Sequence, residues 1–290
     1  MQRREFLRLT GAACLATLAK PAFAETIASR TIPGTSEQLP VIGLGNSNAF
    51  RRGDVEASME VIERLMQFGG RYIDCIGDSR YVAAEAARRL EFGDVLLGAY
   101  FDLEKPEIAK LDVARLAGDS GSMTLMNCFT DQVDEHWGVM QGFKEAGLTK
   151  FIGTARHTSD YYDTMINLMK TGTLDVLQVN YSMLEPEAAE RVLPTALDQG
   201  IAVMINRPFI NGRYFGVVRG KTLPEWAGEF DCESWAQFSL KYILSHPTVS
   251  CVLTETENPI HAIDNLRAGL GRLPDEKMRR RMREHLLSLT

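Results

Sequence analysis

The sequence predicts a single (β/α)8 barrel with an N-terminal β-hairpin and an extra C-terminal helix. Short apolar runs of strand length alternate with longer stretches of helical period from residue 41 to residue 270. The short runs are continuously apolar rather than alternating, which is typical of parallel strands covered on both faces. No linker-like composition interrupts this alternation, so eight strand–helix repeats predict one closed barrel.

The predicted strands lie at residues 41–44, 72–76, 95–101, 123–129, 151–154, 176–181, 202–206 and 251–254. The predicted helices between them lie at residues 55–68, 81–90, 105–117, 133–146, 160–169, 187–198, 232–244 and 260–270. Several of these helices end at a glycine, which commonly supplies the left-handed residue after a helix. Residues 31–39, with Pro33-Gly34 at their centre, predict a hairpin that closes the floor of the barrel. Residues 275–287 predict a final, arginine-rich helix.

The first 24 residues have the pattern of a twin-arginine export signal. Arg3 and Arg4 precede a short apolar run that is roughly half as long as a membrane-spanning helix. The run is followed by a small–large–small triplet ending at Ala24, which a signal peptidase accepts. We therefore expect residues 1–24 to be a signal peptide, residues 25–290 to form the barrel, and the protein to be periplasmic.

Composition excludes several classes of partner. The chain has 32 basic and 38 acidic residues and a formal net charge of −6, and the leader is its basic part. Such an acidic protein lacks the positive surface that binds nucleic acid or an anionic membrane, and no other stretch approaches a membrane span. An even number of cysteines follows the leader, which permits disulfides, but their apolar surroundings favour buried free thiols. They are Cys75, Cys128, Cys232 and Cys251.

Polar residues at the carboxyl ends of the predicted strands are the candidates for function, because barrels of this class carry their chemistry there. These positions include Asp74, Tyr100, Asn127, Arg156, Gln178, Asn206, Arg207 and Glu255. No spacing of histidine, cysteine and carboxylate residues resembles a metal site, so no metal is predicted. The expected partner is a small molecule at the barrel mouth.

Motifs throughout the chain resemble the aldo-keto reductase family. They lie at residues 40–45, 69–74, 151–153, 178–182, 205–209, 235–247 and 258–266. The Asn-Arg-Pro-Phe run at residues 206–209 and the twin-arginine leader resemble a bacterial exported branch of that family. The resemblance implies a (β/α)8 fold and reduction of carbonyls with NADH or NADPH.

The resemblance also implies four catalytic side chains, of which this sequence keeps one. Family members use an aspartate, a tyrosine that donates a proton, a lysine that lowers the pKa of that tyrosine, and a histidine that orients the carbonyl. Asp74 matches the aspartate. The tyrosine, lysine and histidine positions hold Ser79, Tyr100 and Asn127.

The cofactor-binding positions implied by the resemblance are partly retained. Gln178 matches the glutamine that binds the nicotinamide amide, and Asn206 agrees with the exported branch. Arg207 is a candidate contact for an anion or a phosphate, and Thr256 and Asn265 lie at the nucleotide end. Glu255 lies there too and would repel a 2′-phosphate, so it disfavours NADP. The cofactor would be NAD or NADP if either binds.

Two hypotheses follow. The first is a degenerate family member that binds a small molecule or a partner at the barrel mouth without reducing carbonyls. The second is an active NAD(P)H-dependent carbonyl oxidoreductase whose acid is Tyr100, acting with Asp74 and Asn127. An aspartate without a lysine raises the pKa of a nearby tyrosine, which would make Tyr100 a poorer acid.

Overall fold

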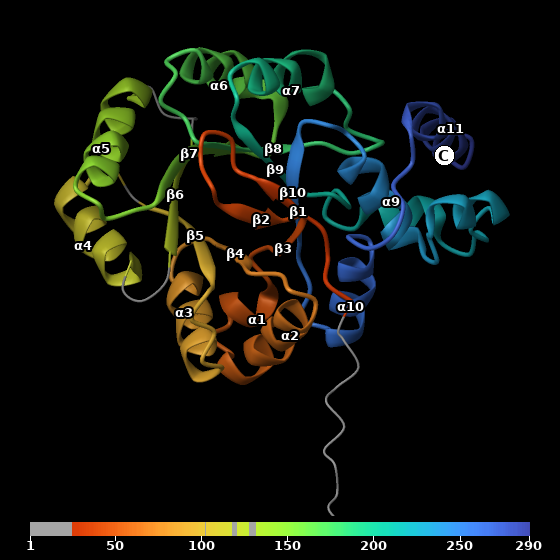
Figure 1. The fold of residues 1–290 in the computed structure, drawn as a ribbon, viewed down its shortest axis with the longest axis horizontal. Coiled ribbons are helices and arrows are strands. Elements are labelled where there is room, and N and C mark those ends of the chain that lie inside the picture. The colour runs from red at the N-terminus through yellow and green to blue at the C-terminus, as the bar shows by residue number, and fades with distance from the viewer. Residues whose placement is uncertain (1–24, 102, 118–120, 128–131) are drawn as a thin grey trace, which may run out of the picture.

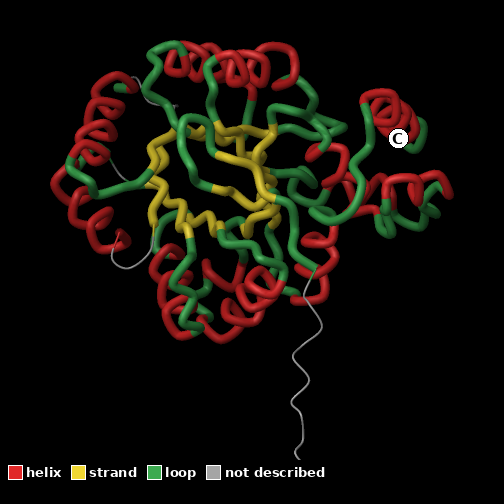
Figure 2. Tube along the Cα trace, in the orientation of Figure 1, coloured by secondary structure: helices red, strands yellow, loops and turns green. Residues whose placement is uncertain are grey.

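A closed barrel of eight parallel strands forms the centre of the protein, and the sheet order is β10-β3-β4-β5-β6-β7-β8-β9. The computed structural model describes residues 25–290 except 102, 118–120 and 128–131, so the predicted signal peptide lies outside the described residues. Figures 1 and 2 show the strands as an inner ring with the helices around it. The strands are β3 (Ile42–Leu44), β4 (Tyr72–Cys75), β5 (Leu96–Tyr100), β6 (Gly121–Asn127), β7 (Phe151–Arg156), β8 (Val176–Asn180), β9 (Ala202–Asn206) and β10 (Val249–Thr254). The predicted fold class is confirmed.

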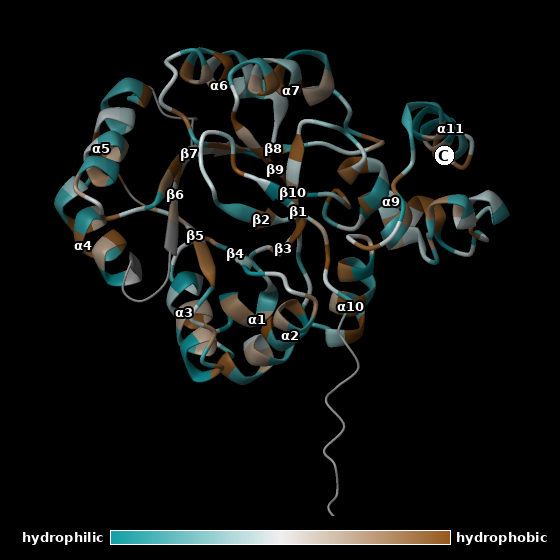
Figure 3. Cartoon of the chain, in the orientation of Figure 1, coloured by the Kyte–Doolittle hydropathy of each residue, from teal (hydrophilic) through white to brown (hydrophobic). Residues whose placement is uncertain are grey.

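The main helices lie close to their predicted positions. They are α2 (Val55–Gln67), α3 (Ser79–Arg89), α4 (Pro106–Ala117), α5 (Val133–Glu145), α6 (Tyr162–Met169), α7 (Ala188–Asp198), α9 (Trp235–Leu244), α10 (Pro259–Arg267) and α11 (Glu276–Leu287). Hydrophilic and hydrophobic residues alternate around them, and α11 is largely hydrophilic (Figure 3). The prediction did not include α1 (Asn48–Arg51) and α8 (Arg213–Val218), which are too short to show a helical period.

The hairpin closes the amino-terminal end of the barrel, as predicted. Strands β1 (Ser29–Thr31) and β2 (Gln38–Pro40) pair antiparallel and lie across the barrel in Figure 1. The guanidinium of Arg30 donates hydrogen bonds to the carbonyl of Leu244 at 2.6 Å and to the carbonyl of Val249, the first residue of β10. The opposite end of the barrel, where the strands finish, is therefore the mouth.

The barrel interior is filled by alternate residues of the strands, because successive side chains of a strand point to opposite faces. Tyr72 is the largest of these side chains and is fully buried. A Cβ atom on Gly98 would lie 1.9 Å from the Tyr72 hydroxyl oxygen, and a Cβ atom on Gly43 would lie 2.9 Å from its ring. The two glycines therefore make the space that the tyrosine ring occupies.

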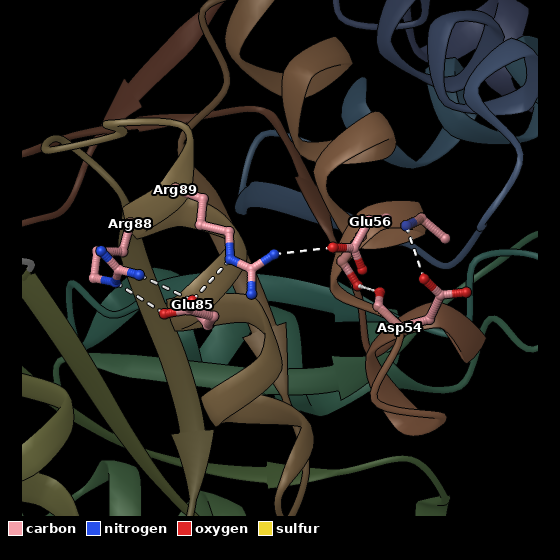
Figure 4. A network of polar contacts seen from close by, with 7 residues as sticks. Asp54, Glu56, Glu85, Arg88 and Arg89 are labelled. Carbon is pink, nitrogen blue, oxygen red and sulfur yellow. Dashed lines mark hydrogen bonds and ion pairs between the residues drawn. The ribbon is translucent and has the colours of Figure 1, made fainter.

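Ion pairs join neighbouring helices on the outside of the barrel. Arg89 on α3 pairs with Glu56 on α2 at 2.9 Å and with Glu85 on its own helix at 2.8 Å (Figure 4). Asp54 begins α2 by accepting a hydrogen bond from the Ala57 amide at 3.0 Å. Exposed pairs of this kind contribute little to stability because solvent screens their charges, so packing rather than charge holds the helices to the barrel.

The described cysteines are buried free thiols, as predicted. Cys75 and Cys251 lie in barrel strands and Cys232 lies just before α9. Cys128 lies outside the described residues. Within the described ranges, none of the helices combines the length and the apolar character that crossing a membrane requires.

Replacing Gly98 by alanine is expected to destabilise the protein by about 1–3 kcal/mol, because the new methyl group overlaps the Tyr72 hydroxyl. The measurement is urea unfolding followed by circular dichroism. Gly142→Ala is the matched control. It lies on α5 with open space where a Cβ would stand, so alanine should leave the free energy of unfolding equal or raise it by up to about 1 kcal/mol. Equal stability of the two variants would show that Tyr72 is not held in this way.

Candidate functional site

A cavity of about 800 Å³ lies at the barrel mouth and contains most of the predicted site residues. The structure brings together Asp74, Tyr100, Gln178, Asn206 and Arg207 in its lining. Thr256 and Asn265 are not part of the lining. Strand β6 ends at Asn127, opposite Ala155 of β7, but the side chain of Asn127 lies outside the described part of the structure.

Asp74 is held at the base of the cavity by two neutral donors. The hydroxyl of Tyr72 donates to Asp74 Oδ1 at 3.1 Å, and the Gln178 amide nitrogen donates to the same oxygen at 3.0 Å. Within the described residues, no hydrogen bond reaches Oδ2. Burial raises the pKa of the Asp74 carboxyl to about 7, although both hydrogen bonds act against this shift.

Gln178 connects Asp74 to the next two side chains of the cavity. Its amide oxygen accepts hydrogen bonds from the Tyr100 hydroxyl and, at 3.3 Å, from the Asn206 amide. Burial, followed by the nearby Asp74, raises the pKa of Tyr100 well above the ordinary value for a tyrosine. Tyr100 and Asp74 are therefore linked by hydrogen bonds to Gln178 rather than by a hydrogen bond to each other.

Ser79 lies away from the cavity lining. It is the first residue of α3, and its hydroxyl lies 2.5 Å from Asn46 Oδ1 and accepts a hydrogen bond from the Ile76 amide at 3.2 Å. These contacts fix the turn between β4 and α3. A tyrosine at the same position would reach farther, and in its absence Asn46 and Ile76 line that wall of the cavity.

The wall formed by the ends of β7 and β9 is cationic. Arg207 has a φ of +50°, a conformation that residues other than glycine rarely adopt. Its guanidinium donates to the His157 carbonyl at 2.6 Å and lies 3.6 Å from the Glu185 carboxylate. Burial, together with the positive charges of Arg156 and Arg207, lowers the pKa of His157, so its imidazole is neutral at pH 7.

Two ion pairs cover the loop after β10, where the family resemblance places the nucleotide end. Glu255 pairs with Arg51 at 2.9 Å and Glu257 pairs with Arg52 at 2.7 Å. Thr256 Oγ1 accepts a hydrogen bond from the Asn258 amide at 3.1 Å. The two carboxylates are thus neutralised by arginines of the short helix α1 and its end, which the sequence pattern did not predict.

Sequence reasoning also missed Tyr72 as a partner of Asp74. A signal was available, because residues two apart on a strand point to the same face, and Tyr72 lies two positions before Asp74. The same rule places Gln178 two residues after Val176, which lies inside the barrel.

The model of the aldo/keto reductase family matches residues 94–285, about two-thirds of the sequence. The chain belongs to the aldo/keto reductase family. No curated protein matches the chain. Solved structures of aldo-keto reductases do match, at identities low enough that the likeness concerns the fold.

Three of these structures illustrate the likeness. An aldo/keto reductase from Klebsiella pneumoniae, in complex with NADP and acetate, shares 18% identity with a TM-score of 0.72 over 90% of this chain and 95% of that one. A Klebsiella pneumoniae aldo-keto reductase in complex with NADPH shares 19% identity with a TM-score of 0.69, covering 91% and 95%. The holo form of a Bacillus halodurans aldo-keto reductase shares 17% identity with a TM-score of 0.69, covering 91% and 96%.

The positions that the resemblance assigns to a nicotinamide cofactor are bonded to other groups of the protein in this structure. Gln178, which the resemblance assigns to the nicotinamide amide, uses its oxygen for Tyr100 and Asn206 and its nitrogen for Asp74. Glu255 and Glu257 stand at the nucleotide end and are bound to arginines. An entering nucleotide would have to displace this network.

The raised pKa of Asp74 has a measurable effect on stability. The carboxyl has a pKa of about 7 in the folded protein and about 3.9 in the unfolded chain, so the folded state binds the proton more tightly between these values. The free energy of unfolding, relative to that of Asp74→Asn, should therefore fall by up to about 4 kcal/mol as pH rises from about 4 to about 8.

Urea unfolding of both proteins across that pH range measures this difference. Asp163→Asn, which removes an exposed carboxylate on α6, is the matched control and should follow the wild type at every pH. A difference between wild type and Asp74→Asn that stays constant with pH would mean that the Asp74 carboxyl titrates normally.

Proposed function

We propose that the protein binds a small polar molecule in the cavity at the barrel mouth and does not carry out nicotinamide-dependent carbonyl reduction. The cavity volume of about 800 Å³ suits a small organic ligand. Its lining of amides, guanidiniums and carboxyls favours a ligand with several hydrogen-bonding groups. Family membership supports a ligand at this end of the barrel, since barrels of this class bind there.

One observation carries this proposal. The partners of Asp74 are the neutral donors Tyr72 and Gln178, at 3.1 and 3.0 Å. In a reductase, as the resemblance describes it, a lysine beside the aspartate lowers the pKa of the acidic tyrosine. Here the pKa of Tyr100 is raised, and its proton is donated to Gln178, so the phenol is poorly suited to give it to a substrate.

A carbonyl oxidoreductase that uses Tyr100 as its acid is the second candidate. It is favoured by the position of Tyr100, which lines the cavity and is linked to Asp74 through Gln178. Such a relay would have to overcome the raised pKa of the phenol. The two candidates differ in whether a nicotinamide nucleotide binds at all.

Export is a separate proposal that rests on the sequence of residues 1–24. The twin arginines, the short apolar run and the small residues around position 24 support secretion to the periplasm by the twin-arginine route.

Titration of the mature protein with NADPH and NADH tests the proposed function. We expect no change in nucleotide fluorescence at micromolar concentrations and no nucleotide oxidation with a panel of aldehydes and ketones. Quenching at micromolar nucleotide would contradict the proposal. In that case Tyr100→Phe should abolish turnover under the second candidate, whereas Tyr162→Phe, a tyrosine outside the cavity lining, should not.

Cell fractionation tests export. The full-length chain should appear in the periplasm without residues 1–24, and replacing both Arg3 and Arg4 by lysine should retain it in the cytoplasm. Mass spectrometry of the periplasmic protein locates the new N-terminus. Cytoplasmic accumulation of the unaltered chain would argue against the signal.

A further inference from the structure

The two oxygens of the Asp74 carboxyl group differ in their hydrogen bonds. Oδ1 receives both hydrogen bonds, from Tyr72 at 3.1 Å and Gln178 at 3.0 Å. Oδ2 receives none from the described residues, and Asp74 is part of the cavity lining. Asp74 as a whole residue is only 5% exposed. A rigidly held carboxyl with one free oxygen is the arrangement expected of a proton acceptor.

The side chains around it belong to few chemical types. Across the cavity they are amides, guanidiniums, an imidazole, a phenol, three aliphatic side chains (Ile76, Ala155 and Leu253) and the carboxyls of Asp74 and Glu255. The Glu255 carboxylate is paired with Arg51 at 2.9 Å, which leaves Asp74 as the carboxyl available for chemistry. Arg156 and Arg207 line the wall formed by β7 and β9 and are close enough to His157 to lower its pKa, and Arg207 is also 3.6 Å from the Glu185 carboxylate. Such a set can take up a proton and stabilise an oxyanion.

We propose that Asp74 is a general base that enolises small α-hydroxy carbonyl compounds in this cavity without a nucleotide. The inference rests on the proposed function, because it requires the ligand to occupy the cavity in place of a cofactor. Asp74 would be a catalytic residue, and Tyr72 and Gln178 would be positioning residues.

The step balances without a further reactant. Asp74 Oδ2 takes the proton from the carbon that bears the hydroxyl group, the C–H bond breaks, and its electron pair forms the C=C bond of an enediolate. The carbonyl oxygen becomes the oxyanion, and the positive charge of Arg156 and Arg207 stabilises it. The carboxylic acid of Asp74 then returns the proton to the same carbon or to the adjacent one. Return to the adjacent carbon, together with transfer of the hydroxyl proton to the former carbonyl oxygen, interconverts an aldehyde and a ketone.

Among the groups at this end of the cavity, the ionisation of Asp74 is the main change in protonation near neutral pH. Tyr72 on its own strand, Tyr100 on β5 and Cys251 on β10 all have pKa values raised by burial and are neutral at pH 7. Glu255 beyond β10 raises the pKa of Asp74 and is itself paired with Arg51. Burial brings the pKa of Asp74 to about 7, so a base at this position gains activity as pH rises through that value.

The experiment is proton NMR of dihydroxyacetone, glyceraldehyde and glycolaldehyde in D2O with the mature protein and no nucleotide. We expect loss of the α-proton signal faster than in buffer, and Asp74→Asn should lower the protein-dependent rate by about 100-fold or more. Asp163→Asn keeps the cavity unchanged and should retain the wild-type rate. The wild-type rate should rise with pH and level off above about 7, a readout that does not depend on the folding of any variant.

Exchange no faster than in buffer for all three probes overturns the inference, and so does an equal rate in Asp74→Asn. A wild-type rate independent of pH between about 5 and about 9 also overturns it. The proposed function fails separately, by nucleotide binding and carbonyl reduction in the titration described above. Exchange is measured without nucleotide, so the two failures are distinguishable.

Discussion

The hydrogen bond from Tyr72 to Asp74 inside the barrel is the interaction on which the site depends. It exists because the tyrosine ring fits between Gly43 and Gly98, where any side chain would overlap it. The hydroxyl then lies 3.1 Å from Asp74 Oδ1, which fixes the carboxyl at a position that is part of the cavity lining. Both glycines belong to strands next to that of the tyrosine. The position of the Asp74 carboxyl at the barrel mouth therefore depends on how Tyr72 packs inside the barrel.

The electrostatics of the site follow from the absence of a cation among the hydrogen-bond partners of Asp74 in the described structure. Two neutral hydrogen bonds offset only part of the cost of burying a carboxylate, so its pKa rises to about 7. The same carboxylate raises the pKa of Tyr100. The family resemblance places a lysine where this chain has Tyr100. A tyrosine in place of that cation thus leaves the pKa values of both Asp74 and Tyr100 raised. The family fold is kept, the position that the resemblance assigns to the acid holds Ser79, and Asp74 becomes the candidate base of the proposal.

The sequence predicts the strands and names several residues that line the cavity, but it does not predict the pairs that these residues form. Apolar runs identify each strand because a buried parallel strand must be apolar on both faces. The resulting order brings Asp74 and Gln178 to one cavity from strands far apart in the chain. The bond between them, however, depends on the stagger of β4 relative to β8 across the barrel, which periodicity does not encode. The pairing of Arg51 with Glu255 joins a helix of four residues to the loop after the last strand, and neither gives a sequence signal.

The pairing of the first and last barrel strands, which closes the barrel, bears on the proposed export. Strand β3 pairs with β10, and the Gly45 amide donates to the Thr254 carbonyl at 2.9 Å, so the first and last strands of the barrel complete each other. Contacts of such long sequence separation form only when the whole chain is present. A barrel of this kind is stable once the whole chain has folded, and an unfolded chain in transit across a membrane lacks these contacts. Transport in the folded state, the route that we propose for this chain, would therefore suit the architecture itself and would not require that a cofactor be loaded beforehand.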